Sequence, residues 1–527
     1  MKISLAQINP IIGNYKHQEK SFKTAISKAI ETNTDLLIFP ELSLTGYPAK
    51  DLLLDNTFIK NQEILIQKII KISAQTKNLG ILFGAVLIQN NQLYNSAYLI
   101  YEGNCLFVTS KTLLPNDDVF DEKRYFEANT TSETVIFKEH KLAITICEDL
   151  WVKNIDLSPI HQLMKQSPTI VINLSASPFY LNKAKNRYNR AKEIVRLYKV
   201  PVIVVNQVGA QDELIFDGNS FILDKNGDCL LQCESFKETQ QTVSLTSKRI
   251  KDFNYQPVNK QLLEALLLGI SDYFKKTGFQ KAVIGLSGGI DSAVCYVLAC
   301  KALGSKNVIP VMMPTAYTSS ESIRDAQKMA SFQKTKLVQL PITDLYESSI
   351  LCLSKVLNMT EMSLTHENIQ ARLRAMLLMA FANHKNALVL STGNKSELAM
   401  GYSTLYGDMA GALSIIGDVL KSQVFNLAKY LNTLTPGCIP QYVITRAPSA
   451  ELKPNQTDQD SLPEYEIIDS FIDLHISSPY KVTTKSKDLS NRLNNNEHKR
   501  NQSAIILKVS QKAFGTGRRF PVAAHYS

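Results

Sequence analysis

The stretch KAVIGLSGGIDSAVCYVLACKAL, residues 281–303, decides the fold of the second half of the chain. It begins with an apolar strand, passes through a turn with two glycines and enters an apolar helix. The same alternation extends on both sides and predicts a doubly wound parallel sheet, which binds ligands at the carboxyl ends of its strands. The expected strands are 281–286, 307–313, 336–341 and 386–391, and the expected helices are 259–276, 291–303, 319–332 and 365–383.

The turn SGGIDS has the composition of an anion site. Unpaired amides at the start of a helix point at the ligand, and the two glycines let the backbone approach it closely. The two serines can add hydroxyl donors. Asp291 would repel a bare phosphate, so its carboxylate predicts a Mg²⁺ ion between it and the phosphates. For the Gly-Gly pair alone, a plain strand–helix turn with Asp291 as helix cap is the alternative.

Residues 1–245 have the pattern of an α/β domain with a mixed sheet, because several apolar runs are continuous, as in strands buried on both faces. The expected strands are 2–8, 35–39, 80–88, 142–147, 169–174 and 201–207, the expected helices are 17–32, 57–77 and 180–198, and hairpins are expected at 93–101 and 220–233. The basic stretch 246–260 contains a proline and predicts a linker to a second domain at 261–527. The Asn-rich stretch 483–503 predicts a flexible loop.

The composition excludes several classes of protein. Of the 527 residues, 44% are hydrophobic and 20% are charged, which excludes intrinsic disorder, collagen-like repeats and a disulfide scaffold for most of the chain. The net charge of +10 favours an anionic ligand, from a nucleotide to a nucleic acid. No apolar run is long enough to span a bilayer, the start lacks a signal-peptide pattern, and the eight cysteines form no CxxC pairs. These features predict a reducing, cytoplasmic setting.

The SGGIDS turn resembles the pyrophosphate loop of the ATP pyrophosphatases, which split ATP between its α and β phosphates. The blocks ENIQARLR (367–374), STGNKSELAMGYSTLYGD (391–408), SIIGDVLKSQV (414–424) and KAFGTGRRFP (512–521) resemble the NAD synthetase family. The resemblance implies ATP binding by Ser287, Gly288, Gly289, Ile290, Asp291, Ser292 and Thr392, and metal binding by Asp291 and Glu397. It implies binding of the deamido dinucleotide by Asn368, Arg372, Glu397, Asp408, Lys421 and Lys512. Singly, the charged residues among them are typical of solvated surface side chains, so the prediction depends on the order of the blocks.

In the first half, three sequence blocks each carry a residue type used in amide hydrolysis. Glu41 lies in FPELSLTGYP, Lys111 opens KTLLPNDDVFDEKRYF, and Cys147 ends LAITIC. The blocks resemble the nitrilase/amidase superfamily, in which a Glu, a Lys and a Cys act together. A nearby carboxylate can take the proton of the cysteine, whose thiolate attacks an amide carbon, and a lysine ammonium can stabilise the oxyanion. Cys147 alone is more typical of a small core residue.

Three further blocks resemble the glutaminase members of that superfamily: SASPF (175–179), KAKNR (183–187) and NQVGAQDELIFDGNSF (206–221). The resemblance implies that Ser177 and Lys183 hold the glutamine. Family members often carry Tyr-Gly after LPN, where this chain has Asp117 and Asp118. Asp117 is therefore expected at the glutamine pocket, while its contact there stays open. Three acids of the last block have no role that the sequence reveals: Asp212, Glu213 and Asp217.

Together the two resemblances point to the glutamine-dependent NAD synthetases. They imply a nitrilase-like α-β-β-α sandwich that hydrolyses glutamine to glutamate and ammonia. They imply a doubly wound ATP-pyrophosphatase-type domain that adenylates nicotinic acid adenine dinucleotide and amidates it to NAD, with release of AMP and pyrophosphate. ATP would be a substrate and Mg²⁺ a cofactor. The expected partners are these small molecules, with no nucleic acid and no membrane, in a homo-oligomer whose ammonia passes through a channel.

Three alternatives stay open from the sequence. An ATP-dependent amidotransferase for another carboxylate or carbonyl would keep the architecture, although GMP synthetase and asparagine synthetase use other glutaminase types. An RNA-binding or tRNA-modifying protein can also carry an SGGxDS loop, but such proteins often have the CxxC pairs that are absent here. A stand-alone amidase with a decayed second domain conflicts with the intact blocks SGGIDS and STGNKSEL.

Overall fold

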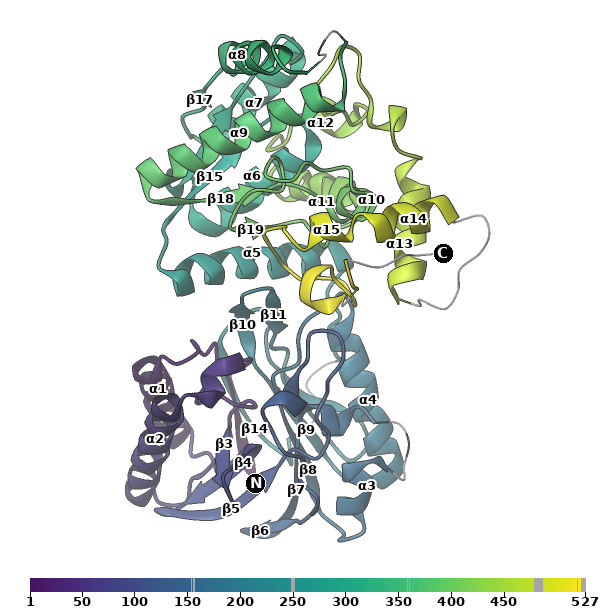
Figure 1. The fold of residues 1–527 in the computed structure, drawn as a ribbon. Helices are drawn as coiled ribbons and strands as arrows, with labels where there is room; N and C mark the ends of the chain where they lie inside the picture. Colours follow the sequence, from purple (N-terminus) through teal and green to yellow (C-terminus); the bar gives the residue numbers. More distant parts are fainter. Residues whose placement is uncertain are drawn as a thin grey trace. The chain divides into compact units, whose positions relative to one another are not determined.

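The computed structural model describes residues 1–152, 154, 157–247, 252–357, 359, 361–477, 487–518 and 520–522. The chain divides into two units, Met1–Gln256 and Pro257–Ser527, and each is described by itself (Figure 1). Of the predicted linker 246–260, residues 252–256 belong to the first unit, and 248–251 lie outside the described residues.

The first unit contains two six-stranded mixed sheets. In spatial order, one consists of β14 (Thr239–Ser244), β1 (Lys2–Gln7), β2 (Leu36–Ile38), β3 (Gly80–Gln89), β4 (Gln92–Tyr101) and β5 (Asn104–Ser110). The other consists of β13 (Cys229–Gln232), β12 (Phe221–Leu223), β9 (Val202–Asn206), β8 (Ile170–Ser175), β7 (His140–Ile146) and β6 (Val135–Phe137). In each sheet the central strands run parallel and the outer ones antiparallel.

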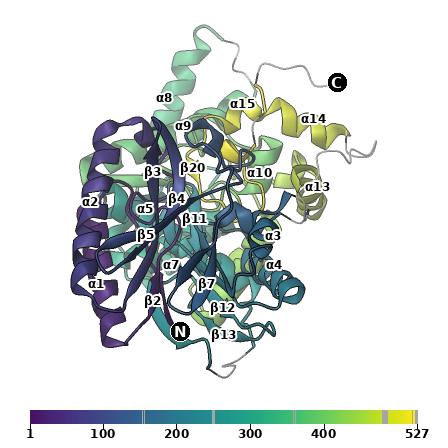
Figure 2. The same cartoon turned by 90° about the horizontal axis from the view of Figure 1, so that it is seen from below.

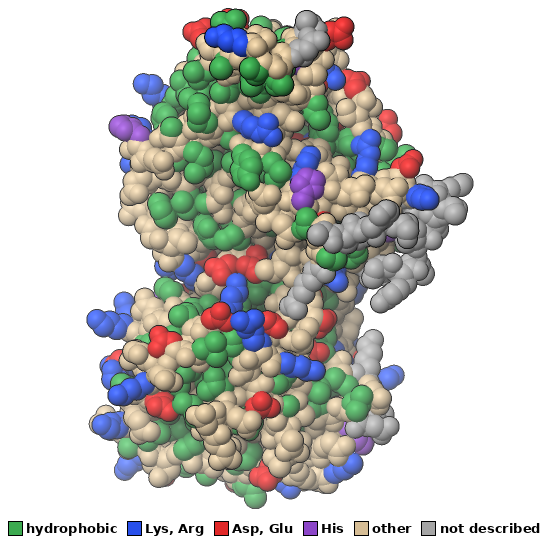
Figure 3. All heavy atoms as spheres, in the orientation of Figure 1, with side chains coloured by type: hydrophobic (Ala, Val, Ile, Leu, Met, Phe, Trp, Pro, Cys, Tyr) green, Lys and Arg blue, Asp and Glu red, His purple; other side chains and the backbone are tan. Residues whose placement is uncertain are grey.

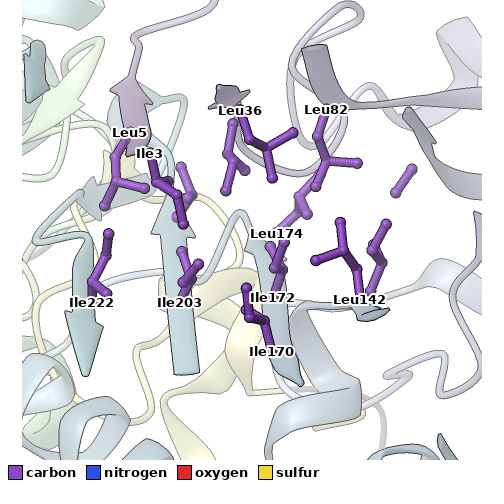
Figure 4. Close-up of a cluster of buried hydrophobic side chains, with 14 of the residues drawn as sticks. Ile3, Leu5, Leu36, Leu82, Leu142, Ile170, Ile172, Leu174, Ile203 and Ile222 are labelled. Atoms are coloured by element: carbon purple, nitrogen blue, oxygen red, sulfur yellow. The ribbon is translucent and has the colours of Figure 1, made fainter. Parts of the chain in front are cut away.

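The two sheets pack face to face through aliphatic side chains. Figure 4 shows Ile3, Leu5 and Leu36 of one sheet opposite Ile172 and Ile203 of the other, in a cluster of buried residues. The helices α1 (Tyr15–Glu31) and α2 (Asn56–Gln75) cover the outer face of the first sheet. The helices α3 (Pro159–Met164) and α4 (Lys183–Tyr198) cover that of the second (Figure 2). The unit is thus an α-β-β-α sandwich, as the sequence predicted.

The second unit is built on one parallel sheet of six strands in the order β17-β16-β15-β18-β19-β20. The strands are β15 (Lys281–Gly285), β16 (Val308–Met312), β17 (Val338–Gln339), β18 (Ala387–Ser391), β19 (Leu413–Ser414) and β20 (Ile505–Ile506). Numbered along the unit, this order is 3-2-1-4-5-6, that of a doubly wound sheet. Its direction reverses between β15 and β18, so a ligand is expected outside their carboxyl ends.

Helices flank this sheet. They are α5 (Val258–Thr277), α6 (Ile290–Leu303), α7 (Ser320–Phe332), α8 (Thr343–Ser354), α9 (Leu364–Lys385), α10 (Lys395–Met400), α11 (Lys421–Leu434), α12 (Gln441–Thr445), α13 (Tyr465–Ser477), α14 (Lys487–Asn495) and α15 (Glu497–Arg500). Helix α9 packs on β15, β16 and β18. Helix α6 packs against α5 and α11, and its residues 292–300 are buried throughout.

Most predicted elements are confirmed, and two predictions are wrong: the loop at 483–503 and the hairpin at 93–101. The stretch 483–503 is no flexible loop where the structure describes it, because α14 and α15 occupy most of 487–500. Leu489 and Leu493, four residues apart on α14, are buried in a cluster with Phe471 and Phe514. Residues 483–486 lie outside the described part. The predicted hairpin at 220–233 is β12–β13, whereas 93–101 is the middle strand of an antiparallel set of three.

Two further features bear on possible partners. No helix in the described part of the chain is long and apolar enough to cross a membrane. On the face shown in Figure 3, Lys and Arg side chains lie interspersed with Asp and Glu side chains.

Candidate active sites

The first unit brings Glu41, Lys111 and Cys147 together after three different strands. Glu41 follows β2, Lys111 follows β5 and Cys147 follows β7, so residues from both sheets meet at one end of the sandwich. All three side chains are buried. The Lys111 ammonium donates to Glu41 Oε1 at 2.8 Å, and both Glu41 and Lys111 act electrostatically on Cys147.

Three donors hold the Glu41 carboxyl group in place. Besides Lys111, Asn95 Nδ2 donates to its Oε1 at 2.7 Å, and the Ala176 amide donates to its Oε2 at 2.7 Å. The turn that carries Glu41 lies directly on β3. A Cβ added to Gly84 would stand 2.2 Å from Leu42 N, so only glycine fits there.

Cys147 is held in an unusual backbone conformation. Its φ of 38° lies in the left-handed region, which is rare outside glycine, asparagine and aspartate. The turn is fixed by Asp149, whose carboxylate accepts the amides of Ile146, Thr112 and Leu113 at 3.0–3.2 Å. Burial raises the pKa of the Cys147 thiol well above its usual value, and Glu41 adds to the effect. Cys147 is therefore a thiol that would need a base to act as a nucleophile.

A fourth residue, Glu122, completes this cluster and was not predicted. Its Oε1 accepts Lys111 Nζ at 2.7 Å and the Tyr47 hydroxyl at 2.8 Å. Burial raises the pKa of Glu122 to about 7. Although burial alone would lower it, Glu122 and Glu41 raise the pKa of Lys111 well above its usual value, so this lysine stays an ammonium. Glu122 lies in the block KTLLPNDDVFDEKRYF, but nothing in the sequence separates it from the neighbouring acids.

The residues expected to hold glutamine lie around the same cysteine. Lys183, at the start of α4, has its Nζ 3.8 Å from the centroid of the Trp151 ring and interacts electrostatically with Cys147. Burial lowers the pKa of Lys183 to about 8. Ser177 is buried, and its amide donates to Asn206 Oδ1 at 2.9 Å. Asp117 is exposed and interacts with Glu148, the residue after Cys147.

The structure separates the three acids whose role the sequence left open. Asp217 is buried, and each of its two carboxylate oxygens accepts a hydrogen bond from Arg187 Nη2 at 2.9 Å. It also accepts Asn206 Nδ2 at 3.0 Å, so it supports the loop that holds Ser177. Asp212 and Glu213 instead lie 3.2 and 3.7 Å from the exposed Lys50.

The second unit has a cavity of about 300 Å³ at the carboxyl ends of β15 and β18, where the strand order reverses. Nine of the predicted residues line it: Ser287, Gly289, Ile290, Asp291, Ser292, Thr392, Glu397, Asp408 and Lys421. The SGGIDS turn thus forms one wall, and residues that follow β18 form another.

A largely buried ion cluster connects these two walls. Lys421 Nζ donates to Asp291 Oδ2 at 2.6 Å and to Glu397 Oε1 at 3.0 Å. Asn394, the cap of α10, donates to Asp291 Oδ1 at 2.9 Å. Burial raises the pKa of Glu397 to about 8, with Asp291 adding and Lys421 opposing. Asp458 also acts on Lys421, and the sequence did not single it out.

Four predicted residues do not line the cavity: Gly288, Asn368, Arg372 and Lys512. Asn368 lies behind it, since its Oδ1 accepts the hydroxyl of the lining residue Thr404 at 2.7 Å. Arg372 is exposed, with its Nε donating to Leu405 O at 3.1 Å. The main-chain carbonyl of Lys512 accepts Lys395 Nζ at 2.9 Å.

Two arginines that sequence reasoning did not assign to the site line the cavity instead. Arg374 on α9 donates from Nε to Met313 O at 3.1 Å, and burial lowers its pKa to about 10. Arg446 follows α12 and contacts the SGGIDS turn. The sequence QARLR contains Arg372 and Arg374, and it does not indicate which of the two side chains lines the cavity.

The donor set of the cavity suits a hard cation that also binds phosphate. Among the described residues, no group of three or more His, Cys, Asp and Glu side chains is placed to hold a metal. Mg²⁺, however, is commonly bound through one or two carboxylates together with substrate phosphates. Asp291 and Glu397 line the cavity and share Lys421 Nζ as a partner, so two carboxylates are available and the residues present fit the ion.

The two halves of the chain match the sequence patterns of two protein families. Residues 2–255 match Carbon-nitrogen hydrolase, and residues 262–503 match NAD synthase. The glutamine-dependent NAD(+) synthetase of Acinetobacter baylyi is 40% identical over 99% of this chain and 98% of its own. That of Synechocystis is 39% identical, again over 99% and 98%. A solved structure of glutamine-dependent NAD+ synthetase from Acinetobacter baumannii, in complex with adenosine diphosphate, is 35% identical, with a TM-score of 0.80 over 99% of this chain and 98% of that one.

Proposed function

The chain belongs to the family of glutamine-dependent NAD(+) synthetases, and from this premise we propose which of its residues perform each half of the reaction. It is an ATP-dependent amidating ligase with a glutaminase domain and an NAD synthase domain. One observation carries the assignment of residues. A buried Glu41–Lys111 pair stands at Cys147, and the SGGIDS turn of the same chain lines a cavity.

In the glutaminase half, Glu41 takes the proton of Cys147 as the sulfur attacks the amide carbon of glutamine. The Lys111 ammonium stabilises the oxyanion of the tetrahedral intermediate, an effect of a few kcal/mol for contacts of this kind. Glu41 returns the proton to the leaving nitrogen, and ammonia departs. Glu41 then deprotonates a water, which cleaves the thioester to glutamate and restores the thiol. Glu122 keeps Lys111 charged and fixed throughout.

Recognition of glutamine falls to groups around the nucleophile. The Lys183 ammonium pairs with the α-carboxylate of the substrate, and Ser177 contacts it from the loop that Asn206 supports. Asp117 faces the α-ammonium group from the exposed rim. Support comes from the electrostatic interaction of Lys183 with Cys147 and of Asp117 with Glu148.

In the synthetase half, the carboxylate of the deamido dinucleotide attacks the α phosphorus of ATP, and pyrophosphate leaves toward the SGGIDS turn. Lys421 neutralises charge beside the reacting phosphate, and Thr392 and Ser292 donate hydroxyl hydrogen bonds. Ammonia then attacks the carbonyl of the adenylate, and AMP leaves as NAD forms. Asp408, Asn368, Arg372 and Lys512 are proposed to bind the dinucleotide. Adenylation is needed because a free carboxylate is a poor electrophile.

Mg²⁺ would be held by Asp291 and Glu397 and would neutralise phosphate oxygens when bound. Lys421 joins the same two carboxylates and so keeps them in place. The place of both carboxylates in the lining of the cavity supports this assignment.

We further propose that ammonia travels within the protein, because in neutral water it would be protonated to a non-nucleophilic ion. The test is to add a second enzyme that consumes free ammonia in solution. An unchanged yield of NAD from glutamine in its presence is expected. A yield that falls as the scavenger is added would overturn the proposal.

A homo-oligomer is proposed from an apolar surface of the second unit. No residue of α8 is buried, and apolar side chains around it are exposed: Leu345, Leu351, Val356, Leu357, Met362 and Leu364. Surfaces of this kind usually mark protein contacts. Light scattering should give a mass above that of one chain, and a monomer at micromolar concentration would contradict the proposal. A cytoplasmic setting, and the absence of nucleic-acid partners, stay predictions from the sequence.

The product pattern tests the function as a whole. The purified chain, supplied with glutamine, ATP, Mg²⁺ and nicotinic acid adenine dinucleotide, is expected to form NAD, glutamate, AMP and pyrophosphate. Formation of ADP in place of AMP would contradict it, since cleavage would then fall between the β and γ phosphates.

A further inference from the structure

Arg446 joins two segments that meet around the SGGIDS turn. It follows α12, far from the turn in sequence, and it lines the same cavity. Its Nη2 donates to Gly288 O at 2.5 Å, and its Nη1 donates to Ser322 Oγ at 2.8 Å. The side chain is only 17% exposed, so both contacts are largely shielded from water.

The contact with Gly288 O fixes the orientation of the peptide bond between Gly288 and Gly289. Gly288 has a φ of +85°, and an added Cβ would stand 2.5 Å from Ser322 O, so the turn rests directly on the first turn of α7. Two successive glycines accept both signs of φ, and the peptide between them can rotate at little cost. In a trans peptide the C=O and N–H point in opposite directions. A guanidinium that holds Gly288 O therefore also sets the direction of the Gly289 N–H, which donates to Ser287 Oγ at 3.1 Å.

Glu451, five residues after Arg446, binds the same helix start that Arg446 contacts through Ser322. Its carboxylate accepts Ser319 Oγ at 2.8 Å, Ser322 Oγ at 2.7 Å and the Ser319 amide at 3.3 Å. Ser319 is the N-cap of α7, so the acid ties residues 446–451 to the start of that helix. Ser322 receives from Arg446 and donates to Glu451, which links the two charged side chains through one buried hydroxyl.

We propose that Arg446 is a positioning residue of the adenylation step. It pins the Gly288–Gly289 peptide so that the Gly289 N–H holds Ser287 Oγ, whose hydroxyl then donates to the pyrophosphate of ATP, and Glu451 fixes Ser322, its second anchor. The inference rests on the proposed role of the SGGIDS turn as the pyrophosphate site. Arg446 acts through the backbone, and its own guanidinium is occupied by Gly288 and Ser322.

The test measures pyrophosphate release in a single turnover, with ATP, Mg²⁺ and nicotinic acid adenine dinucleotide and without a nitrogen donor. Arg446→Ala should slow the release about tenfold to a hundredfold, the usual cost of a lost charge-assisted hydrogen bond. Millimolar guanidinium should restore much of the rate, since it can refill the space beside Gly288 O. Arg446→Lys should stay slow, because one ammonium cannot reproduce the two-pronged contact. Glu451→Gln should be slowed less than Arg446→Ala.

Arg324→Ala is the matched control, since that arginine pairs with Glu321 on the exposed side of α7 and should leave the rate unchanged. Wild-type release in Arg446→Ala would overturn the inference, and so would full activity of Arg446→Lys, which would indicate charge alone. Failure to respond to guanidinium would also count against it, because a general folding defect would not be rescued. Asp291→Ala distinguishes a failure of the positioning role of Arg446 from a failure of the proposed adenylation site. If it abolishes release while Arg446→Ala does not, only the positioning role fails, and if neither matters, the proposed adenylation site fails.

Discussion

Lys183, which we propose to bind glutamine, has a pKa that burial lowers into the physiological range. Its ammonium lies against the Trp151 ring, and burial lowers its pKa to about 8, so it is charged below that pH and neutral above it. A neutral amine cannot pair with the α-carboxylate of glutamine. The kcat/KM for glutamine should therefore fall above about pH 8, roughly tenfold per unit, because this parameter reports ionisations of the free enzyme.

The variant Lys183→Met should have a low kcat/KM for glutamine at every pH. Its kcat/KM should not show the fall above about pH 8 that is expected for the wild type. Lys185→Ala, on the exposed side of the same helix, should keep the wild-type profile. Steady-state rates of glutamate formation between pH 6.5 and 9.5 provide the measurement. A wild-type profile in Lys183→Met would remove the lysine from the binding site.

The ionisation of Glu122 should make the unfolding free energy of the protein depend on pH. Burial raises its pKa from 4.5 to about 7, so the folded state retains a proton that the unfolded chain has released. Stability from this group is fully present below about pH 4.5 and is lost as the pH rises through about 7. Glu122→Gln cannot titrate, so its unfolding free energy relative to wild type should rise between about pH 5 and 8, by at most about 3 kcal/mol.

Thermal or urea unfolding across this pH range measures the difference. Glu127→Gln, an exposed neighbour, serves as the control and should run parallel to wild type. A parallel course of Glu122→Gln would mean that Glu122 is ionised throughout.

Among single residues, the sequence indicated the trio proposed to be catalytic but not the residues that support it. Glu41, Lys111 and Cys147 are recognisable because each follows a predicted strand within a distinctive block. Glu122 and Arg446 become visible only through contacts with residues 75 and 158 positions away, Tyr47 and Gly288. Such pairing depends on tertiary structure, which local patterns do not encode.

At the element scale, α14 and α15 show where a reading from composition fails. The stretch is polar and Asn-rich, yet Arg500 is fully buried, pairs with Glu497 at 2.8 Å and donates to Leu398 O at 3.0 Å. It also stacks over Phe514, with its guanidinium carbon 4.8 Å from the ring centroid. These contacts lie outside any local pattern. By contrast, the strand–turn–helix at 281–303 is specified by consecutive residues and was predicted almost to its ends.

Arg500→Ala should destabilise the second unit, by about 2 kcal/mol, because it leaves buried backbone carbonyls without their donor and removes one of the two arginines that pair with Glu497. The measurement is the unfolding free energy of the full chain. Arg492→Ala, at an exposed position on α14, should stay within about 0.5 kcal/mol of wild type. Equal stability of the two variants would mean that the buried pair contributes little.

In the whole molecule, the proposed reaction is divided between two separately built sites. Cys147→Ala should abolish NAD formation from glutamine and leave ammonia-driven NAD formation largely intact. Its control is Cys105→Ala, an exposed cysteine that should change neither activity. Loss of both activities in Cys147→Ala would mean that the cysteine is structural.

The transfer of nitrogen itself tests the central claim most directly. Glutamine labelled with ¹⁵N in its amide is supplied with ATP, Mg²⁺, nicotinic acid adenine dinucleotide and unlabelled ammonium, and the products are read by mass spectrometry. We expect NAD with a predominantly ¹⁵N carboxamide, together with glutamate and one AMP per NAD. Unlabelled NAD, or ADP as the nucleotide product, would contradict it.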